Sequence, residues 1–398
     1  MKPEIRFEGF DDDWEQRKLG EITSYEASSY SANQFKNKEP NGDYPLFDAN
    51  NLVTLTNEYD QEEKYISIIK DGAGVGRVQL RPAKSSVIGT MGYIKKQGSD
   101  LDFIFYIMQQ LNIVAYVTGS TIPHIYYKDY SNENFFVPSL REQKQISRFL
   151  KTIDNLITLH QRKLERLTKY KDTMLEKMFP KEGEIVPELR FSGFTDPWEQ
   201  RKFEDVFVKL QSNSLSWAQL NYEQGIANNV HYGDILIKFG EYLDVGKEEL
   251  PYINNDTLVN KYRASFLENG DIIFADAAED ETVGKCTEIQ GLTTQIVISG
   301  LHTIPCRPIQ SFAKGYLGYY LNSKTYHNQL LPLIQGTKVS SISRSSLNET
   351  YVIYPKNIEE QTKIGLFFNN LDNLITLHQH KLEKFKNMKK ALLDKMFV

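Results

Sequence analysis

The sequence predicts a mixed α+β fold in which an α/β domain followed by a long helix occurs twice. Three observations support this prediction. Two different sequence tags each occur twice, two heptad patterns occupy residues 146–178 and 364–396, and the 398 residues exceed what one ordinary core contains. We therefore expect a pseudo-two-fold arrangement of four segments, namely the domains 1–140 and 181–358 and the helices 141–180 and 359–398.

The two tags give the order of the repeat. PEIRFEGFDDDWEQRK at residues 3–18 returns as PELRFSGFTDPWEQRK at residues 187–202. IDNLITLHQRKLE at residues 153–165 returns as LDNLITLHQHKLE at residues 371–383. The chain therefore contains a tag, a variable region and a helix, twice in succession, as a duplicated structural unit would.

The two variable regions share a faint pattern. A strand-like run at residues 65–70 precedes DGAGVGR, which ends at Arg77, and the run at 271–274 precedes ADAAEDETVGK, which ends at Lys285. Later runs rich in β-branched residues also predict strands, at residues 86–91 and 295–304. We expect one fold with two sets of diverged loops, and such loops are where different binding specificities arise.

Each heptad pattern predicts a long amphipathic helix with an apolar seam. Apolar residues recur at alternating steps of four and three, and a helix of ~35 residues spans ~50 Å. Each seam needs an apolar partner, and the other helix is the obvious one. The predicted seam residues are Ile146, Leu150, Ile153, Ile157, His160 and Leu164, and Ile364, Phe368, Leu371, Ile375, His378 and Leu382.

Polar residues interrupt both seams at matching steps. His160 corresponds to His378, and further along Lys171 corresponds to Lys389. Long or polar side chains at the edge of a seam can extend into solvent. Alternatively, buried polar residues can fix the register of paired helices. The sequence leaves both interpretations open.

The composition is that of a folded protein without membrane or secretion signals. Hydrophobic residues make up 40% of the chain and charged residues 25%. No stretch approaches the ~18 apolar residues of a membrane helix, and the first residues contain no apolar signal-peptide core. Two cysteines, Cys286 and Cys306, predict reduced thiols and a cytoplasmic location. Since the net charge is −5, we expect partner chains to contribute much of any affinity for phosphates.

The tags, the helices and several shorter motifs together resemble the specificity subunits of type I restriction-modification enzymes. The resemblance covers essentially the whole chain and rests on RFxGFxDxWEQRK, LDNLITLHQxKLE, DGAGVGR, and GTMGY at residues 89–93. In the second half, DIIFADAAEDETVGK and ISGLHTI are similar to the other domain type that is common in this family.

The resemblance implies a role in host defence. Each domain would be a target-recognition domain that reads one half of a bipartite, asymmetric sequence in double-stranded DNA. The helices would pack antiparallel as a coiled-coil spacer and dock two modification subunits, which bind S-adenosylmethionine and methylate adenine. Two restriction subunits, on which ATP and Mg are expected, would translocate and cleave DNA. The chain itself would bind no cofactor and would not be catalytic.

Sequence motifs for catalysis are missing. The glycines of DGAGVGR follow G-x-G-x-G, which is not the spacing of a dinucleotide site, and no P-loop motif occurs. His302 and Cys306 lie four residues apart, but two ligands do not make a zinc site, so we predict neither a metal site nor catalytic residues. Two other functions remain open: a duplicated interaction scaffold for a partner other than DNA, and a self-contained modification enzyme, which the missing motifs disfavour.

Two polar loops at matching places in the repeat are the best candidates for DNA contact. They are TGSTIPHIYYKDY at residues 118–130 and QGTKVSSISRSS at residues 335–346. Ser, Thr and Lys commonly donate to phosphates, and the Gly-rich turn that ends at Arg77 would let the backbone approach one. A polar surface loop is the alternative in each case. The predicted DNA-binding residues are Lys70, Arg77, Ser120, Thr121, His124, Lys128, Thr337, Lys338, Ser340, Ser341 and Arg344.

Overall fold

The chain forms two compact units that each combine one α/β domain with parts of two long helices. The computed structural model describes residues 2–28, 30–31, 42–336 and 338–397. Unit 1 comprises residues 1–162 and 379–398, and unit 2 comprises residues 163–378. The division predicted from the sequence assigns the helices to segments of their own, and that division stays a prediction.

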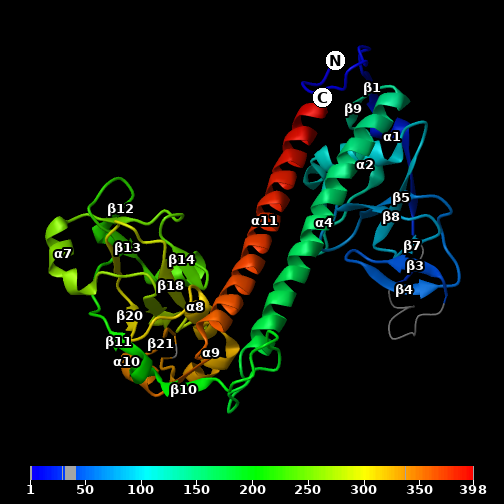
Figure 1. Cartoon of the computed structure of the whole chain (residues 1–398). Coiled ribbons are helices and arrows are strands. Elements are labelled where there is room, and N and C mark those ends of the chain that lie inside the picture. The colour runs from blue at the N-terminus through cyan, green and yellow to red at the C-terminus, as the bar shows by residue number, and fades with distance from the viewer. Residues whose placement is uncertain (1, 29, 32–41, 337, 398) are drawn as a thin grey trace. The chain divides into compact units, whose positions relative to one another are not determined.

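The two long helices are α4 (Leu140–Met178) and α11 (Ile358–Met396), each of 39 residues. Figure 1 shows both as unbroken helices. In unit 1, Ile146, Leu150 and Ile153 of α4 are buried in one hydrophobic cluster with Met396 of α11. In unit 2, residues of α4 and α11 again share a cluster, which includes Met174, Met178, Ile364, Phe368 and Leu371. Among the described residues, no helix is long and apolar enough to cross a membrane.

Unit 1 contains a four-stranded antiparallel sheet in the order β2-β8-β5-β6, a three-stranded sheet in the order β4-β3-β7, and the pair β1-β9. The pair β1-β9 joins the end of the first tag to the residues just before α4. The elements of the domain are β1 (Glu15–Lys18), α1 (Leu19–Ile22), β2 (Thr23–Ala27), β3 (Tyr44–Phe47), β4 (Leu52–Thr56), β5 (Tyr65–Ile69), β6 (Val78–Arg81), β7 (Ser86–Val87), β8 (Met91–Lys96), α2 (Leu101–Gln110), η2 (Ile113–Tyr116), α3 (Tyr127–Tyr130) and β9 (Asn134–Val137).

Unit 2 contains a five-stranded sheet in the order β11-β20-β16-β18-β14, a four-stranded sheet in the order β12-β15-β13-β19, and the pairs β10-β22 and β17-β21. Its elements are β10 (Glu199–Lys202), α5 (Phe203–Val206), β11 (Phe207–Lys209), η3 (Trp217–Gln219), β12 (Leu220–Asn221), β13 (Asn228–Val230), α6 (Tyr232–Ile237), β14 (Tyr242–Asp244), β15 (Tyr252–Ile253), α7 (Asp256–Lys261), η4 (Arg263–Ser265), β16 (Ile272–Ala275), β17 (Ala277–Ala278), β18 (Cys286–Gln290), β19 (Val297–Ser299), β20 (Thr303–Pro308), α8 (Tyr316–Leu321), α9 (Lys324–Leu330), η5 (Leu331–Leu333), β21 (Ser340–Ser341), α10 (Arg344–Asn348) and β22 (Tyr351–Tyr354).

The main sheets of the two units have the same strand order. In chain order, β2, β5, β6 and β8 of unit 1 correspond to β11, β16, β18 and β20 of unit 2, and unit 2 adds β14 at one edge. The tag strand pairs in the same way in both units, as β1-β9 and β10-β22. The predicted mixed α+β architecture with a repeated domain is therefore the one that the structure has.

Two predicted strands are wrong in detail. The runs at 86–91 and 295–304 each contain a turn, which separates β7 from β8 and β19 from β20. In both units the two strands belong to different sheets. The residue before β20, His302, has a φ of 55°, which a continuous strand does not allow. A run of β-branched residues does not reveal such a change of sheet.

Candidate nucleic-acid interface

Each tag is held against the start of a long helix by one bidentate ion pair. In unit 1 the Arg6 guanidinium donates to Glu142 of α4 at 2.7 and 2.8 Å. In unit 2 Arg190 donates to Glu360 of α11 at 2.6 and 2.8 Å. Both glutamate side chains are 1% exposed, and the hydrogen bonds to them raise the pKa of both arginines. The tags are therefore structural, and they fix each domain to its helix.

Within unit 1, a second polar cluster joins the domain to both helices. Lys389 of α11 forms an ion pair with Asp154 of α4 at 2.7 Å. Tyr106 of α2 donates its hydroxyl to the same carboxylate at 2.8 Å. Nearby, the His160 ring stacks on Phe385 of α11 with 5.5 Å between the ring centroids. Because pairs 154–389 and 160–385 run in opposite directions along the two helices, the segments within this unit are antiparallel.

Unit 2 contains the same cluster with one more acid. Lys171 of α4 forms ion pairs with Asp372 of α11 and with Glu241, both at 2.6 Å. Tyr319 of α8 donates to Asp372 at 2.6 Å. Burial opposes the charge of Lys171, but the two carboxylates prevail and raise its pKa. Lys171 is 13% exposed, so the interpretation that the seam lysines extend into solvent is wrong for this residue.

The two candidate DNA-binding segments of the first domain lie side by side. Thr118 and His124 exchange backbone hydrogen bonds of 2.9 and 2.8 Å, which closes the loop between them. The amide of Ile125 then donates to the carbonyl of Lys70 at 3.0 Å, and His124 forms an isolated bridge with Asp71. The loop 118–124 is therefore held against the beginning of the Gly-rich turn.

The second domain has the same backbone arrangement. Gln335 and Ser341 exchange hydrogen bonds of 2.9 and 2.7 Å, and the amide of Ile342 donates to the carbonyl of Asp276 at 2.9 Å. The strands β17 and β21 pair directly. Each domain therefore presents one loop of the same construction beside the end of its central strand, β5 or β16.

A glycine fixes the shape of each loop. Gly119 and Gly336 have φ values of 87° and 105°. A Cβ atom would lie 2.4 Å from the carbonyl oxygen of Ile122 in one case and 2.1 Å from that of Val339 in the other. Only glycine fits both the angle and the space at these two positions, so both loops begin with the same backbone constraint despite their different sequences.

Different side chains occupy matching positions beside the two loops. The amide of Lys70 donates to the carbonyl of Thr90 at 2.9 Å, and the amide of Asp276 donates to that of His302 at 3.1 Å. Asp276 therefore corresponds to Lys70, and His302 to Thr90. The Asp276 carboxylate lies 3.2 Å from the His302 ring, and burial raises the pKa of Asp276. Lys70 in turn forms an ion pair with Asp71.

Most of the predicted DNA-binding side chains are accessible. Arg77, Ser120, Thr121, Lys128, Lys338 and Ser341 are exposed. Lys70, His124, Ser340 and Arg344 are half-buried. Thr337 lies outside the described residues. Lys70 and Arg77 lie outside both loops in sequence, at the two ends of the Gly-rich turn.

Arg344 and Lys285 are less available than their charge suggests. Arg344 donates to Ser212, and burial lowers the pKa of Arg344. Lys285, which ends the second Gly-containing turn as Arg77 ends the first, donates to the carbonyls of Leu236 and Phe239 at 3.0 and 3.2 Å. Lys285 therefore contacts the protein interior, whereas Arg77 is exposed and donates one long hydrogen bond, of 3.4 Å, to the carbonyl of Ala49.

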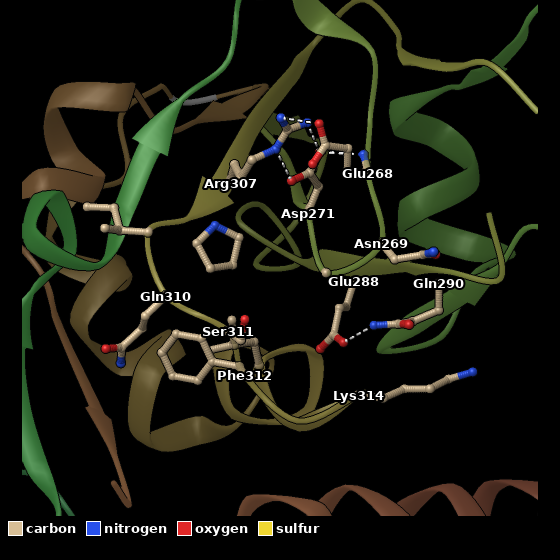
Figure 2. A pocket seen from close by; sticks show the side chains of 14 residues that line it. Glu268, Asn269, Asp271, Glu288, Gln290, Arg307, Gln310, Ser311, Phe312 and Lys314 are labelled. Carbon is tan, nitrogen blue, oxygen red and sulfur yellow. Dashed lines mark hydrogen bonds and ion pairs between the residues drawn. The ribbon is translucent and has the colours of Figure 1, made fainter. Parts of the chain in front are cut away.

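A cavity of ≈ 360 Å³ in unit 2 is lined by none of the predicted residues. The buried charged groups have partners, and Figure 2 shows the pair in which Arg307 donates to Asp271 at 2.8 Å through two nitrogens. The Glu288 carboxylate accepts hydrogen bonds from the amides of Gly315 and Gly318 at 2.7 and 3.0 Å, and burial raises the pKa of Glu288. These contacts stabilise the start of α8, so we assign this cavity a structural role.

Comparison with known proteins gives consistent results. Residues 11–169 match the family described as the type I restriction modification DNA specificity domain. The chain is 26% identical over 406 aligned residues to the type I restriction enzyme MjaVIII specificity subunit of Methanocaldococcus jannaschii, covering 96% of the chain and 92% of that relative. It is 24% identical to a putative MjaX specificity subunit of the same organism, over 51% of the chain and 46% of that relative.

A solved structure shares the fold along the whole chain. It is the S subunit of a type I restriction-modification system from M. genitalium, with a TM-score of 0.67 and 16% sequence identity. The superposition covers 100% of this chain and 99% of that one.

Proposed function

The chain belongs to the family of type I restriction-modification specificity subunits, and from this premise we propose that it reads a bipartite, asymmetric sequence in double-stranded DNA. The observation that supports this most directly is the pair of loops at 118–124 and 335–341, which are closed by the same backbone hydrogen bonds but carry different side chains. The same frame with different donors and acceptors suits two domains that read different bases.

The contrast beside the loops supports the asymmetry of the target. Lys70 can only donate hydrogen bonds, and Thr90 can donate and accept. At the positions equivalent to Lys70 and Thr90, Asp276 is a hydrogen-bond acceptor when ionised, and His302 can donate or accept. Two such surfaces favour different patterns of base edges, so we propose two different half-sites.

We further propose that the long helices set the spacing of the half-sites and dock two modification subunits. The repeated helix tag places leucines at matching positions, Leu159 in unit 1 and Leu377 in unit 2, and each is 45% exposed. Two equivalent exposed apolar positions suit two copies of one partner. On this proposal two restriction subunits complete the assembly in the cytoplasm.

We also propose that this chain is not the catalyst. S-adenosylmethionine, ATP and Mg would then bind to the partner subunits, which would supply both the chemistry and much of the phosphate affinity that a chain of net charge −5 lacks.

The proposal is tested by assembling the chain with the modification subunits and sequencing the methylated motif in the DNA of a host that carries them. We expect a motif in two parts with a fixed gap. Binding of a duplex with this motif would distinguish the proposal from an interaction scaffold for another partner. Methyl transfer by the chain alone, free of every trace of the partner, would contradict it.

The role of the helices as a spacer has a separate test. Four residues inserted after Arg166 lengthen α4 by ~6 Å and rotate its end by ~40°. One base pair advances DNA by ~3.4 Å and ~34°. We expect the gap in the motif to grow by one base pair while both half-sites keep their sequence. An active variant with an unchanged gap would show that the helices do not determine the spacing.

A further inference from the structure

We propose that Ile122 and Val339, one at the same position of each loop, make apolar contacts with DNA bases and contribute to sequence discrimination. This inference rests on the proposed function, since it assigns a task to two residues of the loops that would bind DNA. The predicted set of polar residues does not include them.

The two residues occupy equivalent places by geometry. Ile122 and Val339 each lie three residues after the loop glycine, and their carbonyl oxygens are the atoms nearest to where a Cβ atom of residue 119 or 336 would stand. Two residues later, His124 and Ser341 close the loops by their paired backbone hydrogen bonds. The correspondence therefore follows from the backbone and not only from the alignment of the repeats.

Neither side chain has a role in the core. Ile122 is 63% exposed and Val339 is 54% exposed. An isolated exposed aliphatic residue is common on any protein surface. Here, however, both copies of the fold keep a β-branched aliphatic residue at the same exposed position, while the polar residues around it differ. Packing within the protein does not explain this, whereas contact with a bound molecule does.

The residues around each position point to DNA as that molecule. Ser120 and Thr121 precede Ile122, and all three are exposed. Lys338 precedes Val339, and Ser341 follows it, again with exposed side chains. Hydroxyl and ammonium groups on both sides can hold the loop to the phosphates, which brings the central aliphatic side chain towards the groove. There it can contact a thymine methyl group or the face of a base.

In the second domain an apolar surface continues from this residue. Val339 lines a cavity of ≈ 570 Å³ together with Ala277, Tyr232 and His302. The Tyr232 and His302 rings lie 5.3 Å apart between centroids. We therefore expect the contact made by Val339 to be supported by neighbouring rings.

The test uses the assembly of this chain with its modification subunits and a duplex that carries the motif methylated in the host. Val339→Ala removes two methyl groups, and we expect it to weaken binding of the motif roughly five- to tenfold. Binding of an unrelated duplex and the dependence of log K on log salt should not change, because no phosphate contact is lost. Ile122→Ala should behave likewise.

Matched controls are Ile309→Ala in the second domain and Val114→Ala in the first, which remove exposed aliphatic side chains outside the loops; Ile309 is 59% exposed and Val114 74%. Both should bind the motif as the unchanged chain does. Val339→Ile should retain discrimination, which separates loss of contact from misfolding, and thermal unfolding of each variant checks the fold.

Equal affinity of Val339→Ala and Ile309→Ala for the motif would overturn the inference, as would an equal loss on both duplexes. If the unchanged assembly did not distinguish the motif from the unrelated duplex, the proposed function itself would fail, and the inference with it.

Discussion

The two domains have different side chains at positions where the shared fold does not require the same residue. Both are fixed to their helices by a buried Arg–Glu pair, and both place a Lys–Asp–Tyr cluster between α4 and α11 within their unit. Both close a loop with the same backbone bonds. Beside that loop, however, Lys70 in one domain corresponds to Asp276 in the other. Specific polar contacts therefore maintain the frame, and on the proposed function recognition falls to side chains that the frame does not use.

The frame itself is not identical in the two units. Lys171 has two carboxylate partners and is 13% exposed, whereas Lys389 pairs with Asp154 and is 20% exposed. Glu360 also accepts a hydrogen bond from Trp198 Nε1 at 3.3 Å. From these differences we expect the two halves to differ in stability.

The largest effect is expected when one half is removed. Asp154 and Lys171 lie on the same helix, so in an antiparallel pair of two copies of residues 1–181 each Asp154 meets the partner copy's Lys171. We expect this fragment to form a dimer in sedimentation velocity and to read a symmetric target.

Charge variants test whether the contact between Asp154 and Lys171 holds the fragment dimer together. Asp154→Lys in the fragment places like charges together and should weaken the dimer by about 3 kcal/mol or more. Adding Lys171→Asp restores opposite charges and should recover it. A fragment that stays monomeric at all concentrations would show that the helix clusters do not carry the pairing.

A smaller effect is expected when the ion pair that holds a tag to its helix, Arg6–Glu142 or Arg190–Glu360, is broken. Arg6→Ala leaves the buried Glu142 carboxylate without its ion pair and should destabilise β1-β9 by about 3 kcal/mol. Arg190→Ala should destabilise the pair β10-β22 by a smaller free energy, because Trp198 still donates a hydrogen bond to Glu360. Hydrogen exchange of these strands, followed by mass spectrometry in the full chain, measures both. Equal protection of β1-β9 before and after Arg6→Ala would show that the Arg6–Glu142 ion pair does not hold these strands.

The smallest effects are expected from single basic side chains, the exposed Lys338 and the half-buried Lys285. Lys338→Ala should lower affinity roughly threefold for all DNA sequences and reduce the salt slope by about 1, if Lys338 contacts a phosphate. Lys285→Ala should leave the salt slope unchanged and lower the melting temperature, because the Lys285 ammonium donates hydrogen bonds to two backbone carbonyls. A change of base preference with Lys338→Ala would mean that its role is misassigned.

The sequence predicted features that depend on local or repeated patterns. The heptad steps predicted α4 and α11, and the aligned glycines Gly119 and Gly336 predicted two equivalent loops. It did not reveal the partners of Arg6 and Arg190, because each ion pair joins residues more than a hundred positions apart. Nor did it separate Arg77 from Lys285, which end similar motifs but face solvent and interior respectively.

Ile122 and Val339 were missed for a related reason. An aliphatic residue in a loop predicts burial, and only the fold shows that both are exposed. A signal was nevertheless present, since both follow their glycine by three residues in the repeat.

We propose that the two domains read DNA independently on a common frame. The most direct measurement replaces residues 203–355 with the corresponding region of another member of the family, leaves both tags and both helices in place, and sequences the motif methylated in the host. We expect one half-site to change while the other half-site and the gap between them stay as they were. A simultaneous change of both half-sites would contradict it.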